Sequence, residues 1–422
     1  MEFKYVLGFR RYRALAFGLI GLVYILVFFH RNATAVVAID MMQDLNAEAV
    51  LLGLLAGGYF YSYAFMQLPT GLLSDSWGVR KTIAFTTLIA GVGSIVFGMS
   101  TNIGMAVMGR VIVGIGVSTV YVCALKFISQ WYKKDEFATM NGVLVALGGI
   151  GLLISTMPLA YLSELLGWRS PFIIIGVVTI ALCALVWMFV RNKPEDMEFK
   201  ALHPVNKVHS HSSIVREGIR ILRTREFWPL AIWLFCGMSI YISFGGLWGG
   251  PYLIQTYGLS KIEASRILSM IAVGMIFGSP FLGFLSDKVL KRRRIVILSA
   301  SSLLLLNMLI LTLFTGSLPI FALYLSFFVM GVVAIGINPL IYATVKDIFP
   351  LELAGTSTGL ANFFPFIGGA IYQPLLGYIL EANGKVGDAY TLAGYRWAIA
   401  ALLITSAIAF VSTLLIRERK PE

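Results

Sequence analysis

Long apolar runs alternate with short polar segments along almost the whole chain. A helix needs about 20 apolar residues to cross a bilayer. Twelve stretches meet that length: 14–38, 48–72, 82–100, 104–127, 138–162, 170–190, 227–250, 267–286, 295–314, 318–344, 353–380 and 397–416. The pattern predicts an all-α membrane protein with twelve transmembrane helices.

The connections between these runs are short except for one. Residues 191–226 hold eight Lys or Arg, three of the four histidines and no spanning run. They divide the chain into an N-terminal six-helix bundle (1–190), a cytoplasmic linker (191–226) and a C-terminal six-helix bundle (227–422). Within the linker, Ile214, Ile219 and Leu222 recur at helical spacing between Ser213 and Arg225, which predicts a surface helix at the membrane face.

Composition and charge narrow the class of protein. The chain is 58% hydrophobic and 13% charged, whereas soluble domains are about half apolar and about a quarter charged. Of its 33 Lys and Arg, most lie in connections on the side of both termini, and the positive-inside rule places that side in the cytoplasm. We expect a multi-pass protein of a bacterial inner membrane. The net charge of +12 is then a topology signal and requires no nucleic-acid partner.

Two basic stretches mark the same place in each half. The first is Gly71-Leu-Leu-Ser-Asp75-Ser-Trp-Gly78-Val-Arg80-Lys81, and the second is Gly283-Phe-Leu-Ser-Asp287-Lys288-Val-Leu-Lys291-Arg292. Each ends one apolar run and begins the next. The chain is therefore interpreted as two six-helix bundles related by pseudo-two-fold symmetry, with a binding site between them near the bilayer midplane.

The chain resembles the major facilitator superfamily over essentially its whole length. The loop between spans 2 and 3 carries the family motif at Gly71, Asp75, Gly78, Arg80 and Lys81. The second copy, with Gly283, Asp287, Lys291 and Arg292, is a looser match. Asp75 at the end of span 2 can face basic residues or a helix N-terminus of the other half, which suggests a charge clasp that acts as a gate. A basic turn that only sets topology is the alternative.

Ionisable residues inside the spans are the strongest candidates for a functional site, because burying one costs about 2.5–3.5 kcal/mol on insertion scales. They are His30, Arg31, Arg110 and Lys126, and spans 1 to 6 hold no mid-membrane Asp or Glu. A cation without a counter-ion suits an anionic substrate, and the arginine fork matches a carboxylate or phosphate. Alternatives stay open: Arg31 and Arg110 could be structural, Lys126 could snorkel to the surface, and His30 could relay a proton or simply pack.

The region from Tyr24 to Asn32 is similar to sugar-phosphate and organophosphate permeases and to anion:cation symporter-like relatives. In the organophosphate group an arginine at the place of Arg31 binds the substrate phosphate, and a second arginine lies in span 7. Here residues 227–250 contain no Arg or Lys, so a carboxylate or zwitterion also fits. Arg110 opens Arg-Val-Ile-Val-Gly114-Ile-Gly116, which is similar to a superfamily signature whose arginine links span 4 to its neighbours.

Uncharged residues complete the candidate site. Tyr59 and Tyr63 are four apart and share one face of span 2, so they could bind substrate or pack. Asn338, Asn362 and Gln373 are polar groups in second-half spans, either pocket residues or helix–helix contacts. Trp248 lies among four glycines and a proline at the end of span 7, where a bending helix tip could gate the site.

These features predict a secondary active or facilitative transporter that moves a small organic anion by alternating access. Its partners are then an anionic small molecule, the lipid bilayer, and a coupling proton or counter-anion. Two alternatives remain: transport of amino acids, short peptides or a polycarboxylate siderophore, and a non-transporting solute sensor. The sequence holds no nucleophile–base pair, metal-ligand set or nucleotide loop, so we expect no enzyme, no cofactor and no metal.

Overall fold

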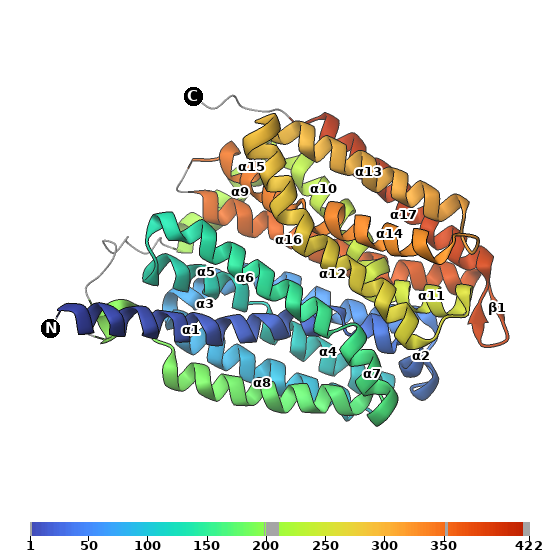
Figure 1. Ribbon diagram of the computed structural model, residues 1–422, viewed down its shortest axis with the longest axis horizontal. Helices are drawn as coiled ribbons and strands as arrows, with labels where there is room; N and C mark the ends of the chain where they lie inside the picture. The colour runs from blue at the N-terminus through green and yellow to red at the C-terminus, as the bar shows by residue number, and fades with distance from the viewer. Residues whose placement is uncertain (1, 198, 200–210, 351–352, 417–422) are drawn as a thin grey trace.

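The described part of the computed structural model, residues 2–197, 199, 211–350 and 353–416, is almost entirely helical (Figure 1). The start of α1 (Glu2–Asn32) and the end of α17 (Leu392–Leu414) lie at one end of the molecule, here called the terminus end, and the opposite end is the distal end. Within these residues, twelve helical stretches are long and apolar enough to cross a membrane. The predicted all-α fold with twelve spans is confirmed.

Eight helices form the first six spans. They are α1 (Glu2–Asn32), α2 (Thr34–Asp44), α3 (Ala49–Gly98), α4 (Ile103–Val117), α5 (Val120–Trp131), α6 (Lys134–Ile154), α7 (Met157–Leu166) and α8 (Arg169–Phe189). A 3-10 turn, η1 (Pro194–Met197), and a short helix, α9 (His211–Leu222), lie between α8 and the second half.

The second six spans contain eight α-helices and three π-helical segments. They are α10 (Phe227–Ile240), η2 (Tyr241–Trp248), α11 (Gly249–Tyr257), α12 (Lys261–Phe284), η3 (Leu285–Leu290), α13 (Arg293–Leu313), α14 (Ile320–Met330), η4 (Gly331–Ile335), α15 (Asn338–Ile348), α16 (Ala354–Ala382) and α17 (Leu392–Leu414). A distal hairpin, β1 (Lys385–Val386) and β2 (Ala389–Tyr390), pairs Lys385 with Tyr390. The sequence pattern did not predict this hairpin.

The first predicted span, 14–38, is wrong at its distal end. Helix α1 stops at Asn32, and α2 begins at Thr34. The Asn32 amide donates to the Phe28 carbonyl at 2.9 Å. A side chain that bonds the carbonyl four residues back competes with the helical ladder and disturbs the helix.

Spans 2 and 3 meet at a sharp kink. Gly78, with φ +79° and ψ 165°, interrupts α3. A Cβ at this position would lie 2.6 Å from the Asn192 Oδ1 atom. Glycine is therefore required both for the positive φ and for the close approach of Asn192.

The predicted surface helix is present as α9, but its buried face differs from the predicted one. Ile221 is fully buried, whereas Ile219 and Leu222 are exposed; the Ile214 side chain lies outside the described residues. α9 packs against α16 and α10, so contact with the second half, rather than the apolar spacing alone, selects the buried position.

The two halves meet along several helix pairs. α3 packs against α16, α12 packs against α6 and α7, and α2 packs against η2 and α11. The approach of α3 to α16 is close, since a Cβ on Gly53 would lie 2.5 Å from the Pro374 Cα atom. This interface holds the candidate site.

Candidate functional site

Arg31 lies at the interface of the halves, enclosed by aromatic rings. Its Cζ atom is 4.6 Å from the Phe28 ring centroid, 5.4 Å from Tyr63 and 5.0 Å from Phe366. Phe366 belongs to α16 of the second half, so both halves contribute to the enclosure. The side chain is 7% exposed. Attraction to ring faces stabilises a guanidinium, but it does not neutralise its charge.

Among the described residues, no carboxylate pairs with Arg31. The ion pairs of that part of the chain are formed by Arg13, Arg169, Lys261, Arg293 and Lys385, and the Arg31 Nε atom has no hydrogen-bond partner there. The phenols of Tyr63, Tyr59, Tyr241 and Tyr24 lie within Coulombic reach of the guanidinium. A buried cation surrounded by neutral polar groups can accept an anion as its counter-ion.

The two tyrosines of span 2 have different neighbours. Tyr63 contacts both Arg31 and Phe366, with ring centroids 4.2 Å apart in the second pair. Tyr59 is fully buried and its ring lies 4.6 Å from the Arg110 Cζ atom. The structure therefore brings Tyr63 to the interface of the halves and places Tyr59 between the two buried arginines.

Arg110 connects span 4 to span 1. Its Nη1 atom donates to the His30 carbonyl at 2.7 Å, and its Cζ atom lies over the rings of Tyr59 and Phe97. The His30 side chain is buried, and its Nε2 atom has no partner within the described residues. These contacts connect span 4 to spans 1, 2 and 3.

Lys126 lies near the terminus end. Its Nζ atom donates to the Ser74 carbonyl at 2.7 Å. Ser74 follows Tyr63 by eleven residues on α3, which corresponds to about 16 Å of helix. Lys126, Gln130 and Asn192 line a polar pocket of about 250 Å³ beside Gly78. The structure thus groups Lys126 with the loop between spans 2 and 3 rather than with Arg31.

Gln373 and Trp248 hold the π-helical segment of span 7. The Gln373 amide donates to the Ile242 carbonyl at 3.0 Å, and the Trp248 indole donates to the Gln373 carbonyl at 2.9 Å. A π-helix shifts the backbone pairing and often marks a functional site. Both side chains are buried, so they support the segment from within.

Asn338 and Asn362 differ in their surroundings. Asn338 is buried, with its Nδ2 atom 2.9 Å from the Met238 sulfur. Asn362 is half-buried; it accepts from the Tyr342 hydroxyl at 2.7 Å and donates to Gln67 of α3 at 3.2 Å. The bond to Gln67 crosses between the halves. Sequence reasoning missed Gln67 and Tyr342, since nothing local distinguishes them from packing residues.

The basic loop of the first half contacts the end of span 6 and the start of the linker. The Arg80 Nε atom donates to the Trp187 carbonyl at 2.8 Å, and the Arg80 amide donates to Asn192 Oδ1 at 2.9 Å. Lys81 is exposed, and Gly71 has open space where a Cβ would lie. The Asp75 side chain, central to the predicted clasp, lies outside the described residues.

In the second copy, residues just beyond the predicted ones make the contacts. Lys291 has a left-handed backbone, with φ 51°, and Lys291 and Arg292 are exposed. Arg293 instead pairs with Asp347, and Arg294 donates to the Leu414 carbonyl at 2.9 Å. Arg294 binds the end of span 12 as Arg80 binds the end of span 6. Gly283 has open space beside it, and the Asp287 side chain is outside the described part.

Charged and polar pairs join the halves at the distal end. Asp40 accepts from Lys261 at 2.6 Å, and Glu48 accepts from Lys385 at 2.6 Å. The hydrogen bond from Lys385 holds the pKa of the Glu48 carboxyl below its usual range.

The first amides of α3 are capped from the other half. The Val50 N–H donates to Glu381 at 2.7 Å, and the Ala49 N–H donates to the Tyr390 hydroxyl at 2.9 Å. These N-terminal amides have no partner within their own helix. Separation of the halves at this end would expose them again.

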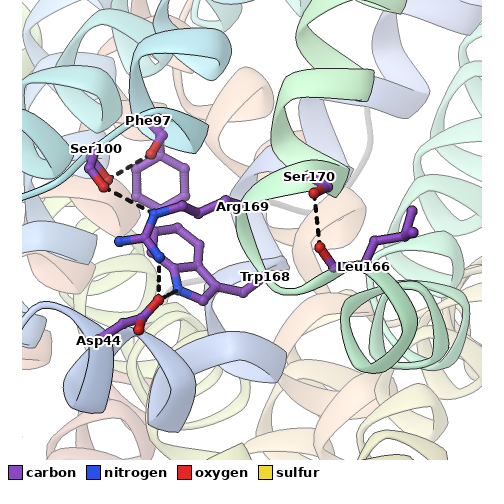
Figure 2. A network of polar contacts seen from close by, with 7 residues as sticks. All are labelled: Asp44, Phe97, Ser100, Leu166, Trp168, Arg169 and Ser170. Atoms are coloured by element: carbon purple, nitrogen blue, oxygen red, sulfur yellow. Dashed lines mark hydrogen bonds and ion pairs between the residues drawn. The ribbon is translucent and has the colours of Figure 1, made fainter.

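A second distal network braces the first half alone (Figure 2). Asp44 at the end of α2 accepts from the Trp168 indole at 2.8 Å and pairs with Arg169, which also donates to the Ser100 carbonyl at 3.0 Å. Hydrogen bonds to Asp44 lower the pKa of its carboxyl; the bond from the Trp168 N–H has the largest effect, and the bond from Arg169 comes second. The network ties α2 to the start of α8.

Fold and site together define a polytopic membrane protein made of two helical halves, with a buried cation where they meet. A family model described as Major Facilitator Superfamily matches residues 20–373. The chain belongs to the Major Facilitator Superfamily.

Relatives named as transporters of organic anions align with most of the chain. A "Probable sulfoacetate transporter" of Cupriavidus necator is 23% identical, with 96% of this chain and 94% of the relative covered. A "Probable galactarate/D-glucarate transporter" of Bacillus subtilis is 27% identical, covering 88% and 86%. A "Probable hexose phosphate transport protein" of Chlamydia trachomatis is 25% identical, covering 92% and 88%.

Among solved structures, a bacterial homolog of the human lysosomal transporter Spinster has the same fold. It was solved in an inward-facing, unoccupied conformation and superposes with a TM-score of 0.74 at 20% identity. The alignment covers 97% of this chain and 99% of that chain. This likeness confirms the two-bundle architecture.

Proposed function

We propose that this protein is a secondary transporter that moves small organic anions by alternating access, and that Arg31 binds the anionic group. The observation that carries the proposal is the placement of Arg31: it is buried between the halves, with no carboxylate partner among the described residues. Relatives named for sulfoacetate, glucarate and hexose phosphate support an anionic cargo.

The remaining roles follow from this proposal. The substrate path is surrounded or supported by residues of both halves. The first half contributes His30 and Tyr63, and the second contributes Asn338, Asn362 and Gln373. Trp248 and the distal ion pairs belong to one gate, and the loops around Asp75 and Asp287 belong to the other. The excess of Lys and Arg supports termini in the cytoplasm of a bacterial inner membrane. The six-helix units 1–190 and 227–422 would move relative to one another, with 191–226 as linker.

A binding assay tests the anionic cargo. Purified protein is titrated with sulfoacetate, D-glucarate and glucose 6-phosphate, and Kd is measured by calorimetry. Arg31→Gln should weaken the ligand that binds by about 10- to 100-fold, because hydrogen bonds to charged groups are worth about 1.5–3 kcal/mol. Arg293→Gln, which removes an arginine of a peripheral ion pair, should leave Kd within twofold. Binding that is unchanged in Arg31→Gln would contradict the proposal.

Counterflow in proteoliposomes separates a transporter from a solute sensor. Vesicles loaded with the unlabelled anion should accumulate the labelled anion transiently, whereas a sensor that binds without flux should show no accumulation. The same assay with Arg31→Gln should lose the signal. Binding without counterflow in the parent protein would favour the sensor.

A further inference from the structure

The same polar pair occurs once in each half, on the terminus side of Arg31. In the first half the Tyr121 hydroxyl donates to Asn141 at 3.4 Å, and in the second the Tyr342 hydroxyl donates to Asn362 at 2.7 Å. Both pairs span 20 residues of sequence. The second pair lies 221 positions after the first for both members (342 − 121 and 362 − 141). The pairs are therefore equivalent under the pseudo-two-fold relation of the halves.

The tyrosines of the two pairs lie near one another and near Arg31. Tyr342 belongs to the second half, yet it is close enough to Tyr121, Tyr63 and Arg31 of the first half to interact with them electrostatically. Tyr121 stacks on Tyr24 of α1, with ring centroids 5.7 Å apart. Tyr24 precedes Arg31 by seven residues, or about 10 Å of helix. A six-carbon acid bound to Arg31 by its carboxylate could reach this region with its tail.

All four side chains are half-buried, in contrast to the buried Arg31. A phenol that donates to the amide oxygen keeps lone pairs that can accept, and each amide keeps N–H donors. Among the described residues the Asn141 amide nitrogen has no protein partner, while that of Asn362 donates to Gln67. The pairs thus offer donors and acceptors together, which is what a hydroxyl group needs, beside the ring faces of Tyr24 and Tyr121.

We infer that the Tyr121–Asn141 and Tyr342–Asn362 pairs form a second subsite that binds the hydroxyl groups of the substrate's uncharged tail. The inference rests on the proposed function and narrows the cargo to polyhydroxylated organic anions, such as sugar acids. Arg31 fixes the charged end, and the paired phenols and amides select a tail that both donates and accepts hydrogen bonds. An alkyl acid of the same charge would satisfy Arg31 but offer no partner to the remaining donors and acceptors of these pairs.

The test compares two six-carbon monocarboxylates, D-gluconate and hexanoate, by calorimetry on the full-length protein. The parent should bind gluconate at least tenfold more tightly than hexanoate. Tyr121→Phe and Tyr342→Phe each remove one hydroxyl and keep the ring, and each should weaken gluconate about 3- to 10-fold while hexanoate changes less than twofold. Tyr252→Phe is the matched control, since that buried hydroxyl bonds Tyr257 and the Gly316 backbone and neither polar pair; it should alter neither ligand.

Three results would overturn the subsite: a parent that binds neither acid, a parent that does not discriminate between them, or phenylalanine variants that weaken both equally. Arg31→Gln separates this inference from the proposed function. If Arg31→Gln leaves gluconate binding intact while the phenylalanine variants weaken it, the anionic anchor is wrong and the hydroxyl subsite stands. If Arg31→Gln weakens both acids and the phenylalanine variants change neither, the anchor stands and the subsite is wrong.

Discussion

At the scale of single residues, neighbours decide what each charged group does. Arg31 and Arg110 are both buried first-half arginines, yet Arg110 donates to the His30 carbonyl and lies on Tyr59, whereas Arg31 has ring faces from both halves around it. The sequence predicted that these residues matter, because charges are costly in a span. The sequence could not show which of the two arginines is free to bind a ligand, since the partners of both come from distant helices.

The Asp44 network gives a prediction at this scale. In the folded protein the pKa of the Asp44 carboxyl is lowered. The hydrogen bond from the Trp168 N–H contributes most, and the hydrogen bond from Arg169 contributes next. The carboxylate therefore stabilises the fold above about pH 4, the usual pKa of an aspartate, and loses this effect as the pH falls through the lowered value. Asp44→Asn should lower Tm at pH 7, through a loss of about 1 kcal/mol or less for so exposed a pair.

Thermal unfolding from pH 7 to pH 3.5 checks this expectation. The gap in Tm between the parent and Asp44→Asn should be constant down to about pH 5 and close below about pH 4. Asp388→Asn, at an exposed position in the distal hairpin, serves as the control and should match the parent throughout. A gap that widens on acidification would show that the sign of the Asp44 contribution is opposite.

At the scale of elements, spans 1 and 7 are both irregular where they touch. Span 1 breaks between Asn32 and Thr34, and span 7 contains the π-helical segment η2. The Tyr241 hydroxyl donates to Asn32 at 2.6 Å, and Thr34 donates to the Gly246 carbonyl at 3.3 Å. Hydrophobic periodicity predicted both spans but neither irregularity, because side chains of another helix bond the disturbed segments.

We expect the Asn32–Tyr241 bond to favour closure of the distal end. Tyr241→Phe leaves the buried Asn32 oxygen without its donor, which costs about 1–3 kcal/mol, so the distal end should separate more often. Spin labels at Gln43→Cys and Asp388→Cys, both exposed distal positions, report this as a larger long-distance population. Tyr252→Phe should leave the distance distribution unchanged. Equal distributions in parent and Tyr241→Phe would rule out this role.

At the scale of the whole molecule, the described contacts between halves include a set of charged pairs at the distal end and the Asn362–Gln67 bond nearer the terminus end. Such pairs are individually weak, which suits a molecule that must alternate between states of similar free energy. The sequence predicted a clasp at the loops between spans 2 and 3 and between spans 8 and 9. The structure adds the distal clasp, whose members are far apart in sequence.

A charge swap tests the distal clasp. Lys261→Glu places a second carboxylate beside Asp40 and should raise the ratio of open to closed distal ends by about fivefold, the equivalent of about 1 kcal/mol. Asp40→Lys combined with Lys261→Glu restores opposite charges and should return the ratio towards that of the parent. The same spin-label distances provide the readout. If the double variant stays as open as Lys261→Glu, the pair does not control closure.

The sequence by itself determined the twelve spans, the duplication and the family, because burial in lipid imposes long apolar runs and because the repeated loop motif needs only local residues such as Gly78. It also made Arg31 a candidate binding residue, since a charge stands out in an apolar run. Only the tertiary structure decided which residues share the site. Phe366 and Tyr342 meet the first-half cluster, and Gln67 meets Asn362, through packing of helices hundreds of residues apart. Such contacts leave no periodic signal in one chain.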